Sequence, residues 1–270
     1  MGTGSVINGP GQIIAIGDSL TAGSQPGITQ YAPFADIRTL ELLHTTYPYM
    51  LGEMLSKKWN GRLVLNLGRS GSTSHEWLPG SSWTKSGVKD FPLNGKPLDE
   101  IMESDKDYRV CLMMIGTNDA SYSVVPDVVA RFIGGVAGYE NGDFLLTKEN
   151  ILACLIKLKE RGLTTYLAKI PPNAYRGGLK YFGIDRLFFM SGSARERLGI
   201  YTKTINNRIE EILETYPDLA RRGPDFHNLL KDHEKIWLKD RLHLNAEGYR
   251  LMAAIWADHL KRDGVIIDQG

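Results

Sequence analysis

Short apolar runs alternate with helical patterns along most of the chain, and this order constrains the fold more than any other feature. Runs rich in β-branched and apolar residues predict five strands, at 12–16, 63–67, 109–115, 164–170 and 225–229. Segments with apolar residues three or four positions apart lie between them. Such an order favours a parallel sheet covered by helices. We therefore predict a doubly wound α/β fold.

Four helical segments carry recognisable boundary residues. Thr147 is a candidate N-cap of a helix that ends at Gly162, and Asn245 is a candidate N-cap of the last helix. Pro48 opens another helix, and Pro217 ends the fourth. The apolar residues expected on their buried faces are Leu51, Met54, Leu55 and Trp59; Ile151, Leu152, Leu155, Ile156 and Leu158; Ile205, Ile209, Ile212 and Leu213; and Tyr249, Met252 and Trp256, with Leu251 and Ile255 beside them.

No repeat or low-complexity linker divides the 270 residues, so we predict a single domain over 1–270. Three connections, at about 72–108, 119–146 and 171–200, are long for a compact domain. Loops of that size tend to be functional.

Composition excludes several classes of protein. Lys and Arg number 32 against 31 Asp and Glu, so the charge gives no reason to expect nucleic acid or an anionic membrane as partner. The longest apolar runs, such as 110–115 and 251–257, are far shorter than the roughly 20 residues of a membrane-spanning helix. Cys111 and Cys154 lie in apolar segments and are expected to be buried thiols. The first 12 residues lack the pattern of a secretory signal, which favours a cytoplasmic location, although secretion stays open if a leader has been removed.

Polar loops follow the first three predicted strands. They read Gly17-Asp18-Ser19-Leu20, Gly68-Arg69-Ser70-Gly71 and Gly116-Thr117-Asn118-Asp119. In an open parallel sheet, ligands bind where the loops at the carboxyl ends of neighbouring strands converge. Ester cleavage through an acyl-enzyme needs a hydroxyl nucleophile, a base with an orienting group, and donors for the oxyanion. Ser19 is the candidate nucleophile, and the backbone N–H groups of Ser19 and Gly71 and the Asn118 amide are the candidate donors.

The candidate base is His243, three residues after Asp240 and just before the cap of the last helix. This spacing lets the Asp240 carboxylate bind His243 Nδ1, which leaves Nε2 free for Ser19. Asp18 and Asp119 are expected to bind loop N–H groups and to hold the shape of the site.

Four ordered blocks, Gly17-Asp18-Ser19-Leu20, Asn66-x-Gly68-x-x-Gly71, Gly116-x-Asn118-Asp119 and Asp240-x-x-His243, resemble the diagnostic blocks of the GDSL or SGNH hydrolase family. The resemblance implies a flavodoxin-like three-layer α/β/α sandwich with about five strands and hydrolysis of esters or thioesters without a metal or other cofactor. It also implies Ser19, Asp240 and His243 as a catalytic triad, with Ser19, Gly71 and Asn118 as oxyanion hole. Ser19 does not lie in the Gly-x-Ser-x-Gly elbow of α/β-hydrolases.

The expected activity is that of a lipase, esterase or acylhydrolase acting on a small-molecule, lipid or carbohydrate ester. A carbohydrate O-deacetylase or a thioesterase on the same scaffold is the alternative, and a non-catalytic binding module is the alternative from another class. The other histidines show no metal-ligand spacing. A phosphate or nucleotide binder is disfavoured because the corresponding glycine motifs are missing.

Two apolar groups in the long loops are candidates for substrate contact. Phe188 and Phe189 could line an acyl pocket or pack a short helix onto the domain. Trp77 and Trp83 could stack on a sugar or cover an acyl chain, or could simply pack their loop. Acyl length, the alcohol and the oligomeric state are not indicated by the sequence.

Overall fold

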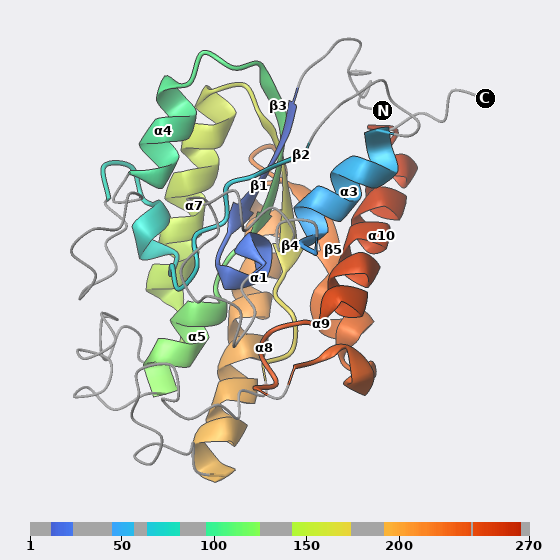
Figure 1. The fold of residues 1–270 in the computed structure, drawn as a ribbon. Coiled ribbons are helices and arrows are strands. Elements are labelled where there is room, and N and C mark those ends of the chain that lie inside the picture. Colours follow the sequence, from blue (N-terminus) through green and yellow to red (C-terminus); the bar gives the residue numbers. More distant parts are fainter. Residues whose placement is uncertain are drawn as a thin grey trace, which may run out of the picture.

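The structure is a computed structural model, and it describes residues 12–23, 45–56, 64–81, 96–124, 142–173, 192–238 and 240–265. A five-stranded sheet in the order β2-β1-β3-β4-β5, with every neighbouring pair parallel, forms its centre (Figure 1). The strands are β1 (Gln12–Gly17), β2 (Val64–Asn66), β3 (Tyr108–Met114), β4 (Thr164–Lys169) and β5 (Arg221–Asp225). This order is the flavodoxin-like one, in which chain direction across the sheet reverses at β1.

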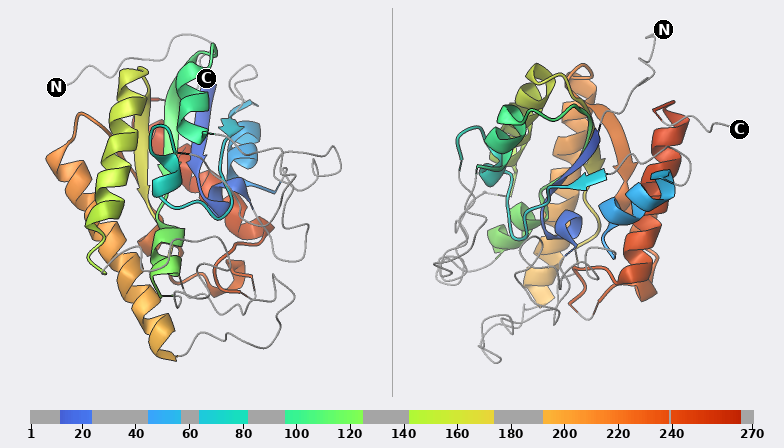
Figure 2. Two further views of the ribbon diagram at one scale, coloured as in Figure 1. Left: turned by 90° about the vertical axis from the view of Figure 1, so that its left-hand side faces the viewer. Right: turned by 45° about the horizontal axis from the view of Figure 1, so that its top comes forward.

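Helices cover both faces of the sheet, as the resemblance implied. On one side lie α4 (Pro97–Glu103), α5 (Thr117–Val124), α7 (Leu145–Glu160) and α8 (Gly192–Thr215), and on the other lie α3 (Tyr47–Ser56) and α10 (Ala246–Arg262) (Figures 1 and 2). Shorter helices are α1 (Ser19–Ala22), η2 (His75–Trp77), α9 (Phe226–Leu230) and η4 (Glu234–Ile236). The three-layer α/β/α architecture is confirmed. The prediction of one domain over 1–270 stays a prediction.

The central strands are apolar throughout because both faces of the sheet are buried. Residues 110–114 of β3 are almost completely buried, as are residues 14–16 of β1. Most residues of the expected helix faces are buried or partly buried, including Leu51, Ile205 and Trp256. Ile156 of α7 is the exception, because 44% of its surface is exposed. Trp59 lies outside the described residues. Cys111 and Cys154 are buried free thiols, as expected.

The fifth strand was predicted four residues too late. β5 is Arg221–Asp225, and the apolar residues predicted as a strand instead form α9, whose first turn is capped by the Asp225 carboxylate accepting from Asn228 N at 3.0 Å. Gly223 and Pro224 make β5 look unlike a strand. A Cβ at Gly223 would lie 2.8 Å from Ala168 N, so the strand needs glycine where it meets β4.

The prediction for Thr147 was also wrong. α7 begins at Leu145, and its N-cap residue is Phe144, with a φ of 55°. Thr147 lies inside the first turn, and its hydroxyl donates to Asp119 at 3.1 Å. Asn245, in contrast, is the N-cap of α10, and its side chain accepts from Gly248 N at 3.0 Å.

The long predicted connections contain regular structure. η2 and α4 lie within 72–108, α5 occupies the start of 119–146, and α8 begins within 171–200. Within the described ranges, no helix is long and apolar enough to cross a membrane.

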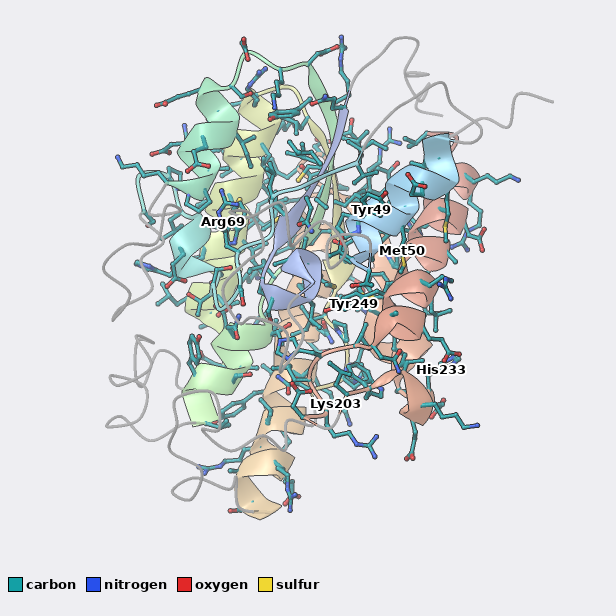
Figure 3. All side chains as sticks on the ribbon, in the orientation of Figure 1. Tyr49, Met50, Arg69, Lys203, His233 and Tyr249 are labelled. Atoms are coloured by element: carbon teal, nitrogen blue, oxygen red, sulfur yellow. The ribbon has the colours of Figure 1, made fainter. Side chains whose placement is uncertain are left out.

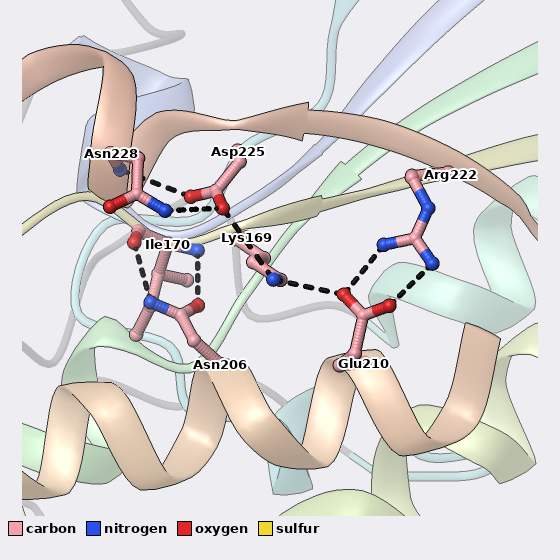
Figure 4. Close-up of polar contacts among 7 residues, drawn as sticks. All are labelled: Lys169, Ile170, Asn206, Glu210, Arg222, Asp225 and Asn228. Atoms are coloured by element: carbon pink, nitrogen blue, oxygen red, sulfur yellow. Dashed lines mark hydrogen bonds and ion pairs between the residues drawn. The ribbon is translucent and has the colours of Figure 1, made fainter. Parts of the chain in front are cut away.

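Polar contacts fasten α8 to the carboxyl end of β4 and to β5 (Figure 4). The Asn206 amide accepts from Ile170 N at 2.8 Å and donates to Ile170 O at 3.0 Å. One turn later, the Glu210 carboxylate pairs with Lys169 at 2.9 Å and with both terminal guanidinium nitrogens of Arg222. The Asn206 contacts fix the backbone just beyond the end of β4, at the edge of the sheet where ligands bind in such folds.

Candidate active site

Ser19 is the first residue of α1 and is separated from the end of β1 by Asp18 alone. Asp18 is the N-cap of this short helix, and its carboxylate accepts from Leu20 N at 3.0 Å. The Asn66 amide, at the end of β2, donates to Thr21 O at 2.9 Å. The turn that carries Ser19 is therefore tied to the neighbouring strand.

A continuous hydrogen-bonded series joins Ser19 to His243 and Asp240. Ser19 Oγ lies 3.0 Å from His243 Nε2, and His243 Nδ1 lies 2.7 Å from Asp240 Oδ2. The serine and the histidine are 224 positions apart in the chain. All three residues are buried, with 5 to 8% of their surface exposed.

The Asp240 carboxylate is held as an anion. Its second oxygen accepts from the N–H groups of Leu242 at 3.0 Å and His243 at 3.1 Å. Burial raises the pKa of this carboxyl, but the hydrogen bond and charge of His243, together with the two N–H groups, outweigh it and bring the pKa below its usual value. An ionised Asp240 can orient His243 so that Nε2 faces Ser19.

The loop that carries His243 is closed by its own backbone. Leu238 N donates to His243 O at 2.9 Å, and Arg241 N donates to Leu238 O at 2.9 Å. Arg241 has a φ of 59°, a left-handed conformation that costs energy for a residue with a Cβ. The tight turn brings Asp240 and His243 onto the same side.

The predicted oxyanion donors come from the loop after β2 and from the first turn of α5, which follows β3. Arg69 N donates to Gly17 O at 2.8 Å, which holds the loop that contains Gly71 against the end of β1. Gly71 has a φ of 81°, and its carbonyl accepts from the Tyr122 hydroxyl at 3.1 Å. Asn118 Nδ2 donates to Ser72 O at 2.9 Å, so the Asn118 amide is fixed against the same loop. The structure thus brings the Gly71 and Asn118 loops together beside the strand end that precedes Ser19.

Close backbone contacts explain two glycines at this edge of the sheet. A Cβ at Gly17, where φ is 152°, would lie 2.1 Å from Met114 O. A Cβ at Gly68 would lie 2.4 Å from Ala22 N. Only glycine lets the strand ends and α1 approach so closely. The buried Arg69 guanidinium pairs with Glu100 of α4 at 2.9 Å and so ties the loop after β2 to that helix (Figure 3).

Asp18 and Asp119 bind loop donors, as expected. Burial raises the pKa of Asp18 to about 6, although its hydrogen bond from Leu20 N lowers it. Burial raises the pKa of Asp119 to about 7, against the lowering effect of hydrogen bonds from Ser74 and Thr147. Both carboxyl groups are fully buried.

Three residues around Asp119 were not identified from the sequence. Ser74, Thr147 and Asn150 form a buried polar cluster with this carboxylate. Their hydrogen bonds join positions 28 to 76 residues apart, so no local spacing could have revealed them.

The suggested substrate role of Trp77 is not supported. Its side chain is 1% exposed, and its Nε1 donates to Ser72 Oγ at 3.1 Å, so the ring packs the loop. Phe188, Phe189 and Trp83 lie outside the described residues. In the part of the chain that the structure describes, no group of three or more His, Cys, Asp or Glu side chains is placed to hold a metal ion.

Comparison with solved structures supports the fold. The psychrotrophic esterase EstA from Pseudoalteromonas sp. is 16% identical, with a TM-score of 0.55 and coverage of 93% of this chain and 97% of that one. Est24, a carbohydrate acetylesterase from Sinorhizobium meliloti, is 17% identical, with a TM-score of 0.58 and coverage of 93% and 99%. A lipase/acylhydrolase from Enterococcus faecalis is 17% identical, with a TM-score of 0.54 and coverage of 93% and 96%.

No curated protein sequence matches the chain. The model of the GDSL-like lipase/acylhydrolase family matches residues 15–251, a span that includes Ser19, Gly71, Asn118, Asp240 and His243. The chain belongs to the GDSL-like lipase/acylhydrolase family.

Proposed function

We propose that this protein hydrolyses carboxylic esters through an acyl-enzyme formed on Ser19. The observation that carries the proposal is the series Ser19 Oγ to His243 Nε2 at 3.0 Å and His243 Nδ1 to Asp240 at 2.7 Å. This is the arrangement that activates a serine hydroxyl, with the base within hydrogen-bond reach and a carboxylate orienting it.

His243 accepts the hydroxyl proton of Ser19 while Ser19 Oγ attacks the carbonyl carbon of the ester. The ionised Asp240 stabilises the imidazolium that forms. His243 then gives the proton to the leaving alcohol, and the carbon–oxygen bond of the ester breaks. Water, deprotonated by the same histidine, attacks the acyl-enzyme and releases the acid and the free serine.

Negative charge on the carbonyl oxygen requires donors placed in advance. We assign this role to the N–H groups of Ser19 and Gly71 and to the Asn118 amide. The role of Asn118 is supported by its fixed orientation. One N–H of its amide donates to Ser72 O at 2.9 Å, and the second N–H of the same group is a donor for the oxyanion. Asn118→Ala should lower kcat by about 10²–10³-fold.

Replacement of the nucleophile tests the proposal directly. Ser19→Ala should reduce hydrolysis of an activated ester such as p-nitrophenyl acetate by at least ~10³-fold while the protein stays folded. Ser104→Ala is the matched control, because Ser104 lies in the turn before β3, at the amino-terminal edge of the sheet. An organophosphonate probe should label the wild-type protein and not Ser19→Ala. Near wild-type turnover by Ser19→Ala would refute the proposal.

The acyl and alcohol parts of the substrate need a separate experiment. A carbohydrate acetyl ester is the second candidate, because Est24, with the same fold, is a carbohydrate acetylesterase. A panel of p-nitrophenyl esters from acetate to palmitate, with an acetylated sugar and an acyl thioester beside it, separates esterase, deacetylase and thioesterase. If the folded protein hydrolyses none of them and no phosphonate labels Ser19, a non-catalytic binding module takes the place of the enzyme.

A further inference from the structure

The buried carboxylate of Asp119 is surrounded by hydrogen-bond donors from two separate elements. Ser74 N donates to it at 3.0 Å, and Ser74 Oγ at 2.6 Å. From α7, Thr147 Oγ1 donates at 3.1 Å. Asn150, also on α7, donates from Nδ2 to Ser74 Oγ at 3.0 Å. All four side chains are buried, so each bond forms in an environment of low dielectric constant.

The cluster of Asp119, Ser74, Thr147 and Asn150 is adjacent to the proposed oxyanion donors. Asp119 is the neighbour of Asn118 on α5, and Ser74 lies two residues after Ser72, whose carbonyl holds the Asn118 amide. A turn further along α5, Tyr122 donates to Gly71 O. Side chains of α5 therefore bind the loop at residues 71, 72 and 74, and Gly71 and Asn118 belong to one fastened unit.

Thr147 and Asn150 fasten this unit from outside. They are three positions apart, so they lie on one face of α7. One of them binds Asp119, on the α5 side, and the other binds Ser74, on the loop side. The loop and α5 are thus both tied to the same turn of a 16-residue helix that packs against the sheet.

We propose that Thr147 and Asn150 are positioning residues for the oxyanion hole formed by Gly71 and Asn118. The proposal rests on the proposed function, since it presumes that these two donors meet an oxyanion. Donors preorganised for the oxyanion contribute more to the transition state than to the bound ester. Loosening their support therefore lowers kcat and leaves KM nearly unchanged.

Thr147→Val tests this with little change of shape, because valine replaces the hydroxyl by a methyl group. It should lower kcat by about tenfold, with KM changed by less than about threefold, since a small misplacement of catalytic groups costs up to ~10²-fold in rate. Thr147→Ser, which restores a hydroxyl, should return kcat to within about threefold of wild type. The control is Thr165→Val, because Thr165 is equally buried but lies near the amino-terminal end of β4; its kcat should not change.

A double-mutant cycle separates positioning from general damage to the fold. In an Asn118→Ala background one of the two donors that Thr147 helps to place is gone and only Gly71 remains, so Thr147→Val should lower kcat by clearly less than it does in the wild type. A full tenfold loss in that background, or an unchanged kcat for Thr147→Val alone, would overturn the proposal.

Asn150→Ala provides a second variant if Thr147→Val does not fold, with the same expected loss of kcat and an unchanged KM. The proposed function is tested independently by Ser19→Ala. If that variant is inactive while Thr147→Val and Asn150→Ala are fully active, only the positioning role fails.

Discussion

The raised pKa of Asp119 makes the free energy of unfolding depend on pH where ordinary carboxyl groups no longer titrate. Burial raises this pKa from 3.8 to about 7. The folded state therefore keeps its proton at pH values where the unfolded chain has already released it. Stability from this group is present in full below pH ~4, is lost as pH rises between ~4 and ~7, and stays lost above that range.

The size of the effect follows from the two pKa values. One pKa unit corresponds to about 1.4 kcal/mol, so a shift of roughly three units amounts to about 4 kcal/mol over the whole window. Between pH 5 and pH 8 the same two values give a loss of about 2.5 kcal/mol from Asp119 alone. This is a large part of the stability of an ordinary domain.

Urea unfolding of the wild type and of Asp119→Asn at pH 5 and pH 8 measures this contribution. Asparagine does not titrate, so the wild type should lose about 2.5 kcal/mol more between the two pH values than the variant does. Asp18, with a pKa of about 6, acts in the same direction, and His227, whose pKa is lowered by burial, acts in the opposite one. Both are present in the two proteins, so the difference isolates Asp119. Equal losses would refute the reasoning, because they would mean that the donors from Ser74 and Thr147 fully offset burial.

Three further substitutions test single features of the fold. Gly17→Ala should destabilise the protein by at least ~3 kcal/mol, measured by thermal unfolding, because its Cβ would lie 2.1 Å from Met114 O; a variant of wild-type stability would contradict the close approach. Arg241→Gly should unfold at about the same urea concentration as the wild type or slightly higher, whereas Arg241→Val should lose about 1–2 kcal/mol, because φ is 59° at this position; the reverse order would argue against the left-handed turn. Glu210→Gln weakens a half-exposed ion-pair network with Arg222 and should cost about 0.5–1 kcal/mol at low salt and less at 1 M NaCl; a loss independent of salt would mean that packing dominates there.

The parts of the fold that could be predicted from sequence are those in which one local pattern carries the information. β1, β3 and β4 are continuous apolar runs because both faces of the sheet are buried. The N-cap Asn245 is visible for the same reason, since a cap acts within one turn. The prediction of the fifth strand failed because β5 contains Gly223 and Pro224, two residue types with low strand propensity.

In the candidate site, too, local sequence identifies some residues, whereas their contacts depend on the fold. Ser19, Asn118 and His243 stand in loops whose composition is unusual, so they could be selected from the chain before any contact was known. The distance of 3.0 Å between Ser19 Oγ and His243 Nε2 depends on a contact across 224 residues, and only the fold supplies it. Thr147 shows the opposite case. A threonine at the start of a helical pattern is typical of a cap, and nothing local distinguishes a cap hydroxyl from one that binds a carboxylate of another helix.

The two halves of the site are fastened to opposite layers of the sandwich. The Gly71 loop and Asn118, in the first turn of α5, are held together with α7 on one face of the sheet, whereas the loop of His243 leads into α10 on the other face. Ser19 lies between them, in a turn that α3 holds through Tyr47 and Thr21, at 3.3 Å, and that β2 holds through Asn66. Catalysis needs the base and the oxyanion donors at fixed positions relative to Ser19 Oγ. The rigid sheet between the two helical layers keeps them there. Substitutions in α7 should therefore disturb the oxyanion donors without lengthening the hydrogen bond between Ser19 and His243. Phosphonate labelling of Ser19 also requires the oxyanion hole, so its rate should fall in Thr147→Val.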